Sequence, residues 1–374
     1  MNGARILRTG AAAVLGLAIG AGTLSASATE LRIASGTVSK NALNGGMYKF
    51  AELIAQKTDG AYTGKVFPGT LLSFAEMTNG VRDGVVDVGY VIPAYTRAEF
   101  PQTNLLIDMS TASSDPVVMA GAINDYMFSC APCLKEFDAL NQVFLGFSVA
   151  GPYYLMSTKK IASLDDFRGK TIRGIGPFGR WIEAMGGKSV LVTSTDVYES
   201  LNQGQLDGNT QGLDTLKSMS LGDIVDYVLD IPIGLYLGSA LYDVNRDVWD
   251  DMTPEHRRAF LAAAAEGHAW TTINYFAENN VFLTHPETGG VEIVKPDEKL
   301  AAASAAFREA DLDTVAKINA EKYGITDATE RVARLRGLVK KWEGLMQDVD
   351  KTDVAAVAAI YDREIFTRID PSAL

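Results

Sequence analysis

The chain has 374 residues, with 34 lysine and arginine residues against 46 aspartate and glutamate residues, for a formal net charge of −12 at pH 7. Hydrophobic residues make up 47% and charged residues 21%, which excludes disordered, collagen-like and coiled-coil chains. The acidic balance also excludes nucleic-acid binding, because backbone phosphates require a basic surface. The length is enough for about two domains, each with its own core.

Residues 1–28 have the pattern of a secretory signal peptide. Arg5 and Arg8 give a positive start, an apolar run follows over 11–24, and small residues at 26–28 form a cleavage site. The run has 14 residues, which is short for a membrane span, so cleavage near Ala28 is a better interpretation than an uncleaved anchor. We therefore expect an exported protein of the periplasm.

The chain has two cysteines, Cys130 and Cys133, with C-x-x-C spacing. The same spacing is found in redox sites, but in an oxidising compartment a short structural disulfide is the simpler interpretation. Two cysteines cannot complete a four-ligand zinc site, and the three histidines show no metal-binding spacing. We therefore predict a Cys130–Cys133 disulfide, no metal and no cofactor.

The predicted elements alternate between strands and helices. Up to residue 151 we expect strands at 30–35, 62–67, 85–91 and near 142–148, with helices at 47–58, 74–81 and 115–126. Beyond it we expect strands at 153–158, 170–173 and 189–192, helices at 163–167, 178–185 and 194–202, and a helical remainder from residue 252. This order predicts an α/β architecture with a largely parallel sheet. A Gly/Asp pattern at 84–89 recurs at 204–208, which favours two similarly built lobes with a cleft between them.

Residues Gly174–Gly179 form a G-x-G-x-x-G pattern between a predicted strand and a predicted helix, with Asp196 seventeen residues further on. In a complete βαβ unit this pattern binds a dinucleotide, which would make the chain an exported NAD(P)-dependent oxidoreductase. The preceding strand is not apolar, however, and Pro177 removes a backbone N–H that a pyrophosphate would use. The oxidoreductase is therefore the alternative function.

Arg173 ends the strand before these glycines, and we expect its guanidinium to face the cleft. A guanidinium binds a carboxylate through two parallel hydrogen bonds. Residues 159–188 contain seven basic and three acidic side chains, so this segment should attract an anion. From spacing alone, solvated lysines around a structural arginine remain an alternative. The sequence has no nucleophile-elbow or paired-carboxylate motif, which favours binding over catalysis.

Several segments together resemble the periplasmic solute-binding proteins of TRAP transporters, of the dicarboxylate-binding-protein type. The likeness runs from about Leu31 to Trp270 and is carried by residues 49–53, 66–69, 80–89, 93–95, 100–101, 169–173, 184–187, 196–201, 204–208 and 245–249. It implies a two-lobed α/β periplasmic binding protein (type II-like), with mixed sheets flanked by helices and lobes joined by crossing strands and a long helix. We assign 29–151 with about 243–285 to lobe I. Lobe II is then 152–242 with about 286–374, including the C-terminal helices.

The resemblance implies a binding protein rather than an enzyme. It would capture a carboxylate-bearing organic acid between the lobes and deliver it to the small and large membrane subunits of a TRAP transporter; handover to a signalling receptor would use the same site. In the family, the arginine at the Arg173 position grips the ligand carboxylate. Gln211, with Asn209 beside it, stands where relatives carry a carboxylate-holding asparagine, and Tyr153 stands where some members carry a second arginine.

The resemblance also leaves a set of aromatic residues as candidate walls of the site. These are Phe74, Tyr95, Phe178 and Tyr236. Such walls suit a monocarboxylate with an apolar or aromatic body as well as a C4-dicarboxylate or a sugar acid.

Overall fold

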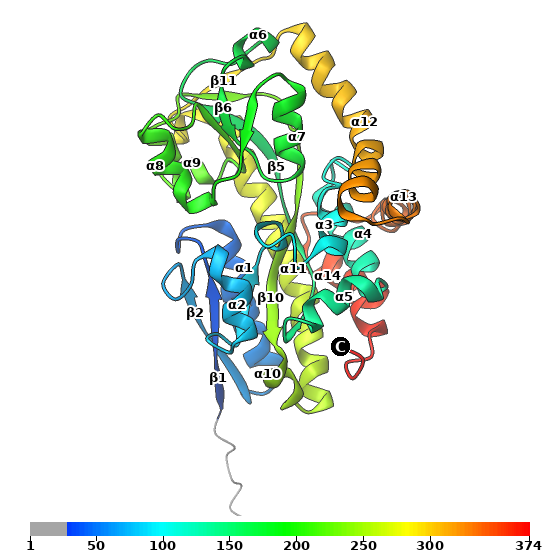
Figure 1. Ribbon diagram of the computed structural model, residues 1–374. Coiled ribbons are helices and arrows are strands. Elements are labelled where there is room, and N and C mark those ends of the chain that lie inside the picture. The colour runs from blue at the N-terminus through cyan, green and yellow to red at the C-terminus, as the bar shows by residue number, and fades with distance from the viewer. Residues whose placement is uncertain (1–27) are drawn as a thin grey trace, which may run out of the picture.

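The computed structural model describes residues 28–374, so the predicted signal peptide lies, apart from its last residue, outside the described residues. Figure 1 shows two lobes of mixed strands and helices, one above the other, with several elements running between them. These crossing elements and the two lobes together position the candidate site.

Two strands and one long helix run through both lobes. They are β5 (Ser148–Ser157), β10 (Gly234–Asn245) and α11 (Pro254–Thr284). Strands β5 and β10 pair antiparallel with each other, and each also pairs with strands of a lobe, so one sheet path continues through the molecule. This arrangement confirms the expected mixed α/β fold, in which crossing strands and a long helix join the lobes (Figure 1).

The first lobe combines parallel strands with a layer of helices. Its elements are β1 (Thr29–Ser35), α1 (Ala42–Lys57), β2 (Tyr62–Pro68), α2 (Phe74–Arg82), β3 (Val88–Val91), α3 (Pro101–Ile107), α4 (Pro116–Phe128), α5 (Ala131–Asp138), β4 (Gln142–Val143) and α10 (Arg246–Asp250). Strand β1 lies parallel to β2 and β3, and β3 pairs antiparallel with β10. Helix α1 begins where the Asn41 side chain accepts a hydrogen bond from the Leu43 N–H, and it buries Met47, Phe50 and Ile54 at helical spacing.

The second lobe is a smaller α/β unit. Its elements are α6 (Leu164–Phe167), β6 (Thr171–Arg173), α7 (Pro177–Ala184), β7 (Lys188–Val190), α8 (Val197–Asn202), β8 (Gly208–Gln211), α9 (Thr215–Ser218), β9 (Tyr227–Leu229) and β11 (Glu292–Val294). Strand β6 lies parallel to both β7 and β8, and β8 pairs antiparallel with β5. The carboxyl ends of β6 and β8 therefore lie side by side, which brings Arg173 and Gln211 to the same edge of the sheet.

The three C-terminal helices, which we expected to belong to the second lobe with the rest of residues 286–374, contact both lobes. They are α12 (Glu298–Tyr323), α13 (Ala328–Leu345) and α14 (Val354–Glu364). Figure 1 shows α12 descending along one side of the molecule from the second lobe, and α13 and α14 then contact α4 of the first lobe. The buried Trp342 lies against Gly121 of α4, and the Tyr361 hydroxyl donates a hydrogen bond to the Val117 carbonyl (2.6 Å). Burial of these aromatic side chains therefore attaches α13 and α14 to α4.

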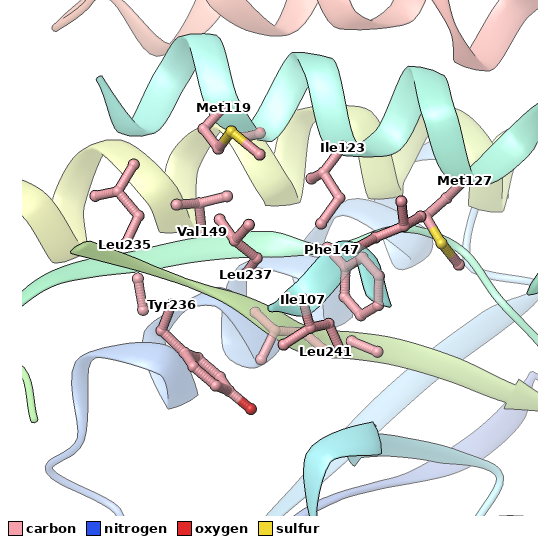
Figure 2. Close-up of a cluster of buried hydrophobic side chains, with 14 of the residues drawn as sticks. Ile107, Met119, Ile123, Met127, Phe147, Val149, Leu235, Tyr236, Leu237 and Leu241 are labelled. Carbon is pink, nitrogen blue, oxygen red and sulfur yellow. The ribbon is translucent and has the colours of Figure 1, made fainter. Parts of the chain in front are cut away.

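The apolar core continues from the crossing strands to α4. Figure 2 shows Met119, Ile123 and Met127 of α4 above the strands, with Leu235 and Leu237 of β10 on the same side and Tyr236 pointing to the opposite side. Side chains alternate between the two faces of a strand, so a single strand supplies both core and site.

The start of helix α5 in the first lobe is cross-linked. Cys130 and Cys133 are joined in a disulfide at the start of α5, where the Cys130 sulfur also accepts a hydrogen bond from the Cys133 N–H.

Within residues 28–374 no single helix is long and apolar enough to cross a membrane, although α4 and α5, bent by 79°, meet the length and composition requirement together.

Candidate functional site

A cavity lies between the lobes where the crossing strands meet the carboxyl ends of β6 and β8. Its volume is about 430 Å³ with its mouth included. Both lobes and α11 contribute to its walls, which contain one arginine, five tyrosines and several smaller polar side chains. The tyrosines are Tyr90, Tyr95, Tyr153, Tyr236 and Tyr275. A concave site with a few convergent polar groups is the usual form of a small-molecule site.

Arg173 is the charged group of this cavity. It ends β6, and only 2% of it is exposed to solvent. Its Nε donates to the Val192 carbonyl (3.1 Å), one terminal nitrogen to the Thr210 carbonyl (3.0 Å) and the other to the Tyr95 hydroxyl (3.2 Å). Among the described residues no carboxylate forms an ion pair with it, and two of its five N–H groups have no partner. The guanidinium is therefore held by neutral groups and remains free to bind an anion.

Tyr95 connects the two lobes at this point. It ends a 3₁₀ turn of the first lobe, η1 (Pro93–Tyr95), whereas Arg173 and Ser194 belong to the second lobe. Its hydroxyl oxygen accepts hydrogen bonds from Arg173 and from the Ser194 N–H (3.1 Å). These two bonds can form only when the lobes are close together.

Three of the predicted aromatic residues form a stack. The Tyr153 ring lies 4.5 Å from the Phe178 ring and 5.6 Å from the Tyr236 ring. Tyr153 and Tyr236 line the cavity, and Phe178 lies behind Tyr153 and is not among the lining residues. Within residues 28–374 the buried Tyr236 hydroxyl has no hydrogen-bond partner, and Figure 2 shows it on the face of β10 away from the apolar core. Phe74 lines the cavity and contacts the Tyr95 ring at a tilt.

The two predicted amides differ in their roles. Gln211 lines the cavity, whereas Asn209 is fully buried and is not part of the lining. The Asn209 side-chain N–H donates to the Gln211 side-chain oxygen (2.8 Å). Asn209 therefore positions Gln211 instead of reaching the cavity itself.

The sequence analysis missed an aspartate just behind the cavity wall. Asp214 is fully buried and accepts hydrogen bonds from the Tyr275 hydroxyl (2.7 Å), the Asn41 side-chain N–H (3.0 Å) and the Ser218 hydroxyl (3.3 Å). Burial, with the nearby charge of Glu278, raises its pKa to about 7. Asn41 and Tyr275 both line the cavity. Asp214 follows Gln211 by three residues, but only the folding of α11 and α1 against it reveals its surroundings.

The basic segment of residues 159–188 has fewer unpaired basic side chains than its composition suggests. Four of its seven basic side chains are ion-paired, with acids that lie mostly outside the segment. Arg180 is held between Asp108 and Asp311, away from the cavity lining. Attraction of an anion therefore depends on Arg173 and not on a basic surface.

The Gly174–Gly179 pattern serves packing in this structure. A Cβ atom on Gly174 would lie 2.8 Å from the Gly179 backbone, and one on Gly179 would lie 2.7 Å from the Ser189 hydroxyl, so both glycines let α7 approach β6 and β7 closely. Gly176 has a φ of +52°, which glycine adopts without strain. In the described part of the chain, no group of three or more His, Cys, Asp and Glu side chains is arranged to hold a metal ion.

Sequence comparisons find a family and two relatives of different coverage. The model of the family described as bacterial extracellular solute-binding protein, family 7 (DctP), matches residues 34–320. A solute-binding protein of Roseobacter denitrificans is 24% identical over 288 residues, which is 74% of this chain and 84% of the relative. An uncharacterized protein of Sinorhizobium fredii is 29% identical over 208 residues, 54% of this chain, and there the match spans only 37% of the relative's length.

Several solved structures share the fold. The Bordetella pertussis extracytoplasmic solute receptor DctP7, which binds pyroglutamic acid, has a TM-score of 0.69 at 20% identity and covers 84% of this chain and 100% of its own. A TRAP solute-binding protein of Bordetella bronchiseptica with bound mandelate has a TM-score of 0.70 at 24% identity, covering 84% and 99%. One from a marine metagenome, specific for aromatic acid ligands, has a TM-score of 0.72 at 20% identity with the same coverage.

The family match covers well over half of the chain and agrees with the two-lobed fold. Proteins of this family bind solutes outside the cytoplasm and are not enzymes, which excludes the oxidoreductase considered from the glycine pattern. The chain belongs to family 7 of the bacterial extracellular solute-binding proteins, the DctP-type extracytoplasmic binding proteins of TRAP transporters.

Proposed function

We propose that this binding protein captures a carboxylate-bearing organic acid in the interlobe cavity and delivers it to the small and large membrane subunits of a TRAP transporter. The observation that carries the proposal is the buried Arg173 guanidinium, which lacks an acidic partner among the described residues and has two unused N–H groups. An unpaired buried charge is costly, and a ligand carboxylate offsets that cost with charge-assisted hydrogen bonds.

The ligands of the structural relatives support a carboxylate. Pyroglutamic acid, mandelate and D-glucuronate occur in three of them, and each is a carboxylic acid. Arg173, Gln211, Tyr153, Tyr95, Phe74 and Tyr236 are the residues that we propose to contact the ligand, because all six line the cavity. Asn209 and Phe178 would act on it through Gln211 and Tyr153.

Capture follows from closure of the lobes around the anion. A carboxylate first binds to Arg173 of the second lobe. On closure, Tyr95 of the first lobe bonds to Arg173 and to the Ser194 N–H. A ligand that touches both lobes stabilises the closed state because its contacts form fully only there. The closed form is then the one that a permease can distinguish from the empty, open form.

A thermal-shift screen tests the proposed function. Organic acids of several classes, each at excess, should include at least one that raises the melting temperature by mass action. Nicotinamide nucleotides serve as the control and should have no effect. If no acid in the panel stabilises the protein, the proposed function is wrong.

The same proposal places signal-peptide cleavage near Ala28. The pattern at 26–28 supports it, and the family functions outside the cytoplasm. The intact mass of the exported protein is expected to correspond to a chain that begins at Thr29. A mass that includes residues 1–28 would contradict cleavage.

A further inference from the structure

Building on the proposed function, we propose that the cavity selects a monocarboxylate whose body carries a neutral hydrogen-bonding group, and that Asp214 excludes a second carboxylate. The inference concerns the class of acid, which neither the family nor the relatives define for this chain. It rests on three features of the cavity: one cation, one buried acid behind the wall, and two hydroxyl groups without partners.

The cavity has a single cation to offer. Among the described residues that line it, Arg173 is the only lysine, arginine or histidine. Tyr153 occupies the position at which the resemblance pointed to a second arginine in some relatives, and its ring is stacked between Phe178 and Tyr236. A second carboxylate on the ligand would therefore leave water without gaining a charged partner, which is unfavourable.

The buried acid makes the part of the cavity wall in front of it unsuitable for an anion. Asp214 lies directly behind Asn41 and Tyr275, and both lining groups turn their donors toward its carboxylate (3.0 and 2.7 Å). The Tyr275 O–H and one of the two Asn41 side-chain N–H groups are thus unavailable to a ligand anion. The charge of Asp214 also acts on three tyrosines of the lining. Burial is the main cause of the raised pKa of Tyr90, Tyr153 and Tyr275, and the negative charge of Asp214 raises the pKa of all three further.

Two hydroxyl groups of the lining are left without partners. The Tyr236 hydroxyl and the Thr37 Oγ1 are buried, line the cavity and form no hydrogen bond within the described residues. Buried polar groups are nearly always paired, so the missing partners are expected on the ligand. Hydroxyl or amide groups on the ligand body can bond to such hydroxyls without adding charge. The cavity therefore matches one carboxylate and a neutral polar body.

Titration calorimetry on the unaltered protein tests this inference at pH 8, above the pKa of about 7 that burial gives Asp214, so that the aspartate is ionised. Two pairs of acids differ only in charge. Succinamate should bind at least about tenfold more tightly than succinate, and 3-carbamoylbenzoate at least about tenfold more tightly than isophthalate, whichever body size the cavity accepts. In a third pair, which has equal charge, 4-hydroxybutyrate should bind more tightly than butyrate, because its hydroxyl group can pair with Thr37 or Tyr236.

The outcomes separate this inference from the function beneath it. If acids bind but the dicarboxylate of a pair binds as tightly as its amide, or butyrate as tightly as 4-hydroxybutyrate, this inference is overturned and the function stands. If none of the six acids and none of the screening panel binds, the proposed function itself fails.

Two variants identify the source of the selectivity. Asp214→Asn removes the negative charge and should reduce the preference for succinamate over succinate by about tenfold. Ser218→Ala is the matched control, because it removes a hydrogen bond from the same carboxylate but keeps the charge. Equal selectivity in the unaltered protein and a folded Asp214→Asn variant would show that the aspartate has no such role, and a variant that does not fold leaves the comparison of acid pairs to decide.

Discussion

Backbone carbonyl groups hold the Arg173 side chain in place. The Val192 and Thr210 carbonyls accept two of its hydrogen bonds, so the second lobe orients the guanidinium before any solute arrives. The guanidinium presents its N–H groups as a planar fork. Because this fork is already oriented, it binds a planar carboxylate with little further loss of side-chain entropy. A flexible lysine at this position would keep the charge but lose the fork.

At the residue scale, we first predict that Arg173→Lys and Arg173→Ala weaken binding of the acid by about a hundredfold or more. Each charge-assisted hydrogen bond contributes about 1.5–3 kcal/mol, and a single ammonium cannot replace the pair. Calorimetry with the tightest acid of the screen measures the effect. Arg168→Lys is the control, because the Arg168 side chain is 80% exposed and pairs with Asp165 on the surface. An unchanged affinity in Arg173→Lys would contradict the role of the fork.

The second prediction concerns the Tyr95 hydroxyl. Tyr95→Phe keeps the ring against Phe74 but removes the bonds to Arg173 and the Ser194 N–H. We expect about tenfold weaker binding, mainly from faster dissociation, because these bonds hold the lobes together after capture. Stopped-flow measurement of both rates checks this. The exposed Tyr48→Phe should change neither rate, and a loss confined to the association rate in Tyr95→Phe would refute the explanation.

The third prediction concerns the buried His268. Its Nε2 donates to the Leu145 carbonyl (3.0 Å) and its Nδ1 accepts from the Ser148 hydroxyl (2.8 Å), so the ring is neutral, and burial lowers its pKa to about 3. The unfolded chain takes up a proton below pH 6.5 and the folded chain does not, so His268 costs stability as the pH falls from about 6.5 toward 3.

Urea denaturation at pH 7, 6 and 5 measures this dependence. As the pH decreases, the free energy of unfolding should fall more steeply for the unaltered protein than for His268→Gln, whose side chain does not titrate. Asp214, with its raised pKa, has the opposite dependence between about pH 4 and 7, but both proteins share it, so it cancels in the comparison. Parallel curves would show that His268 is not responsible.

At the element scale, the elements formed by local patterns were predictable and the crossing strands were not. Helices α2 and α4 lie close to the ranges predicted for them. In the structure, α2 begins with a Ser73–Glu76 capping box, and α4 begins at Pro116 directly after its cap Asp115. Strand β10 was missed because it is buried almost throughout and shows no alternation of apolar and polar residues. The strands expected near 142–148 and at 153–158 are in the structure the short β4 and the longer β5, which runs without a break from one lobe to the other.

The fourth prediction belongs to helices α7 and α12. Arg180 of α7 donates to Asp311 of α12 (2.9 and 3.1 Å) and also pairs with Asp108 of the first lobe (3.4 Å). Both aspartates are almost fully buried, so removal of the arginine leaves two buried carboxylates without this partner. Arg180→Met should destabilise the protein by about 3 kcal/mol or more, measured by chemical denaturation. Arg168→Met, at an exposed pair, should cost less than about 0.5 kcal/mol; equal effects would contradict the argument.

At the scale of the whole molecule, the candidate site combines residues that the sequence showed and residues that only the fold brings together. Arg173 stood out because it ends a strand beside glycines, and in the structure it lines the cavity. Asp214, Tyr275 and Asn41 had no local signal, since they meet from three separate parts of the chain. The positions of the C-terminal helices had no local signal either, because an apolar helix face does not identify the lobe that it will cover.

The shared strands have a consequence for how this molecule can be divided. Strand β10 comes from late in the chain, yet it pairs with β3 of the first lobe. A fragment of residues 29–151 would lack β10, and it would therefore expose the edge of β3 together with apolar surface. Such a fragment would aggregate instead of folding alone. Evolution can therefore exchange the walls of the site by point substitution, but it cannot easily obtain a new receptor by shuffling one lobe as an independent module.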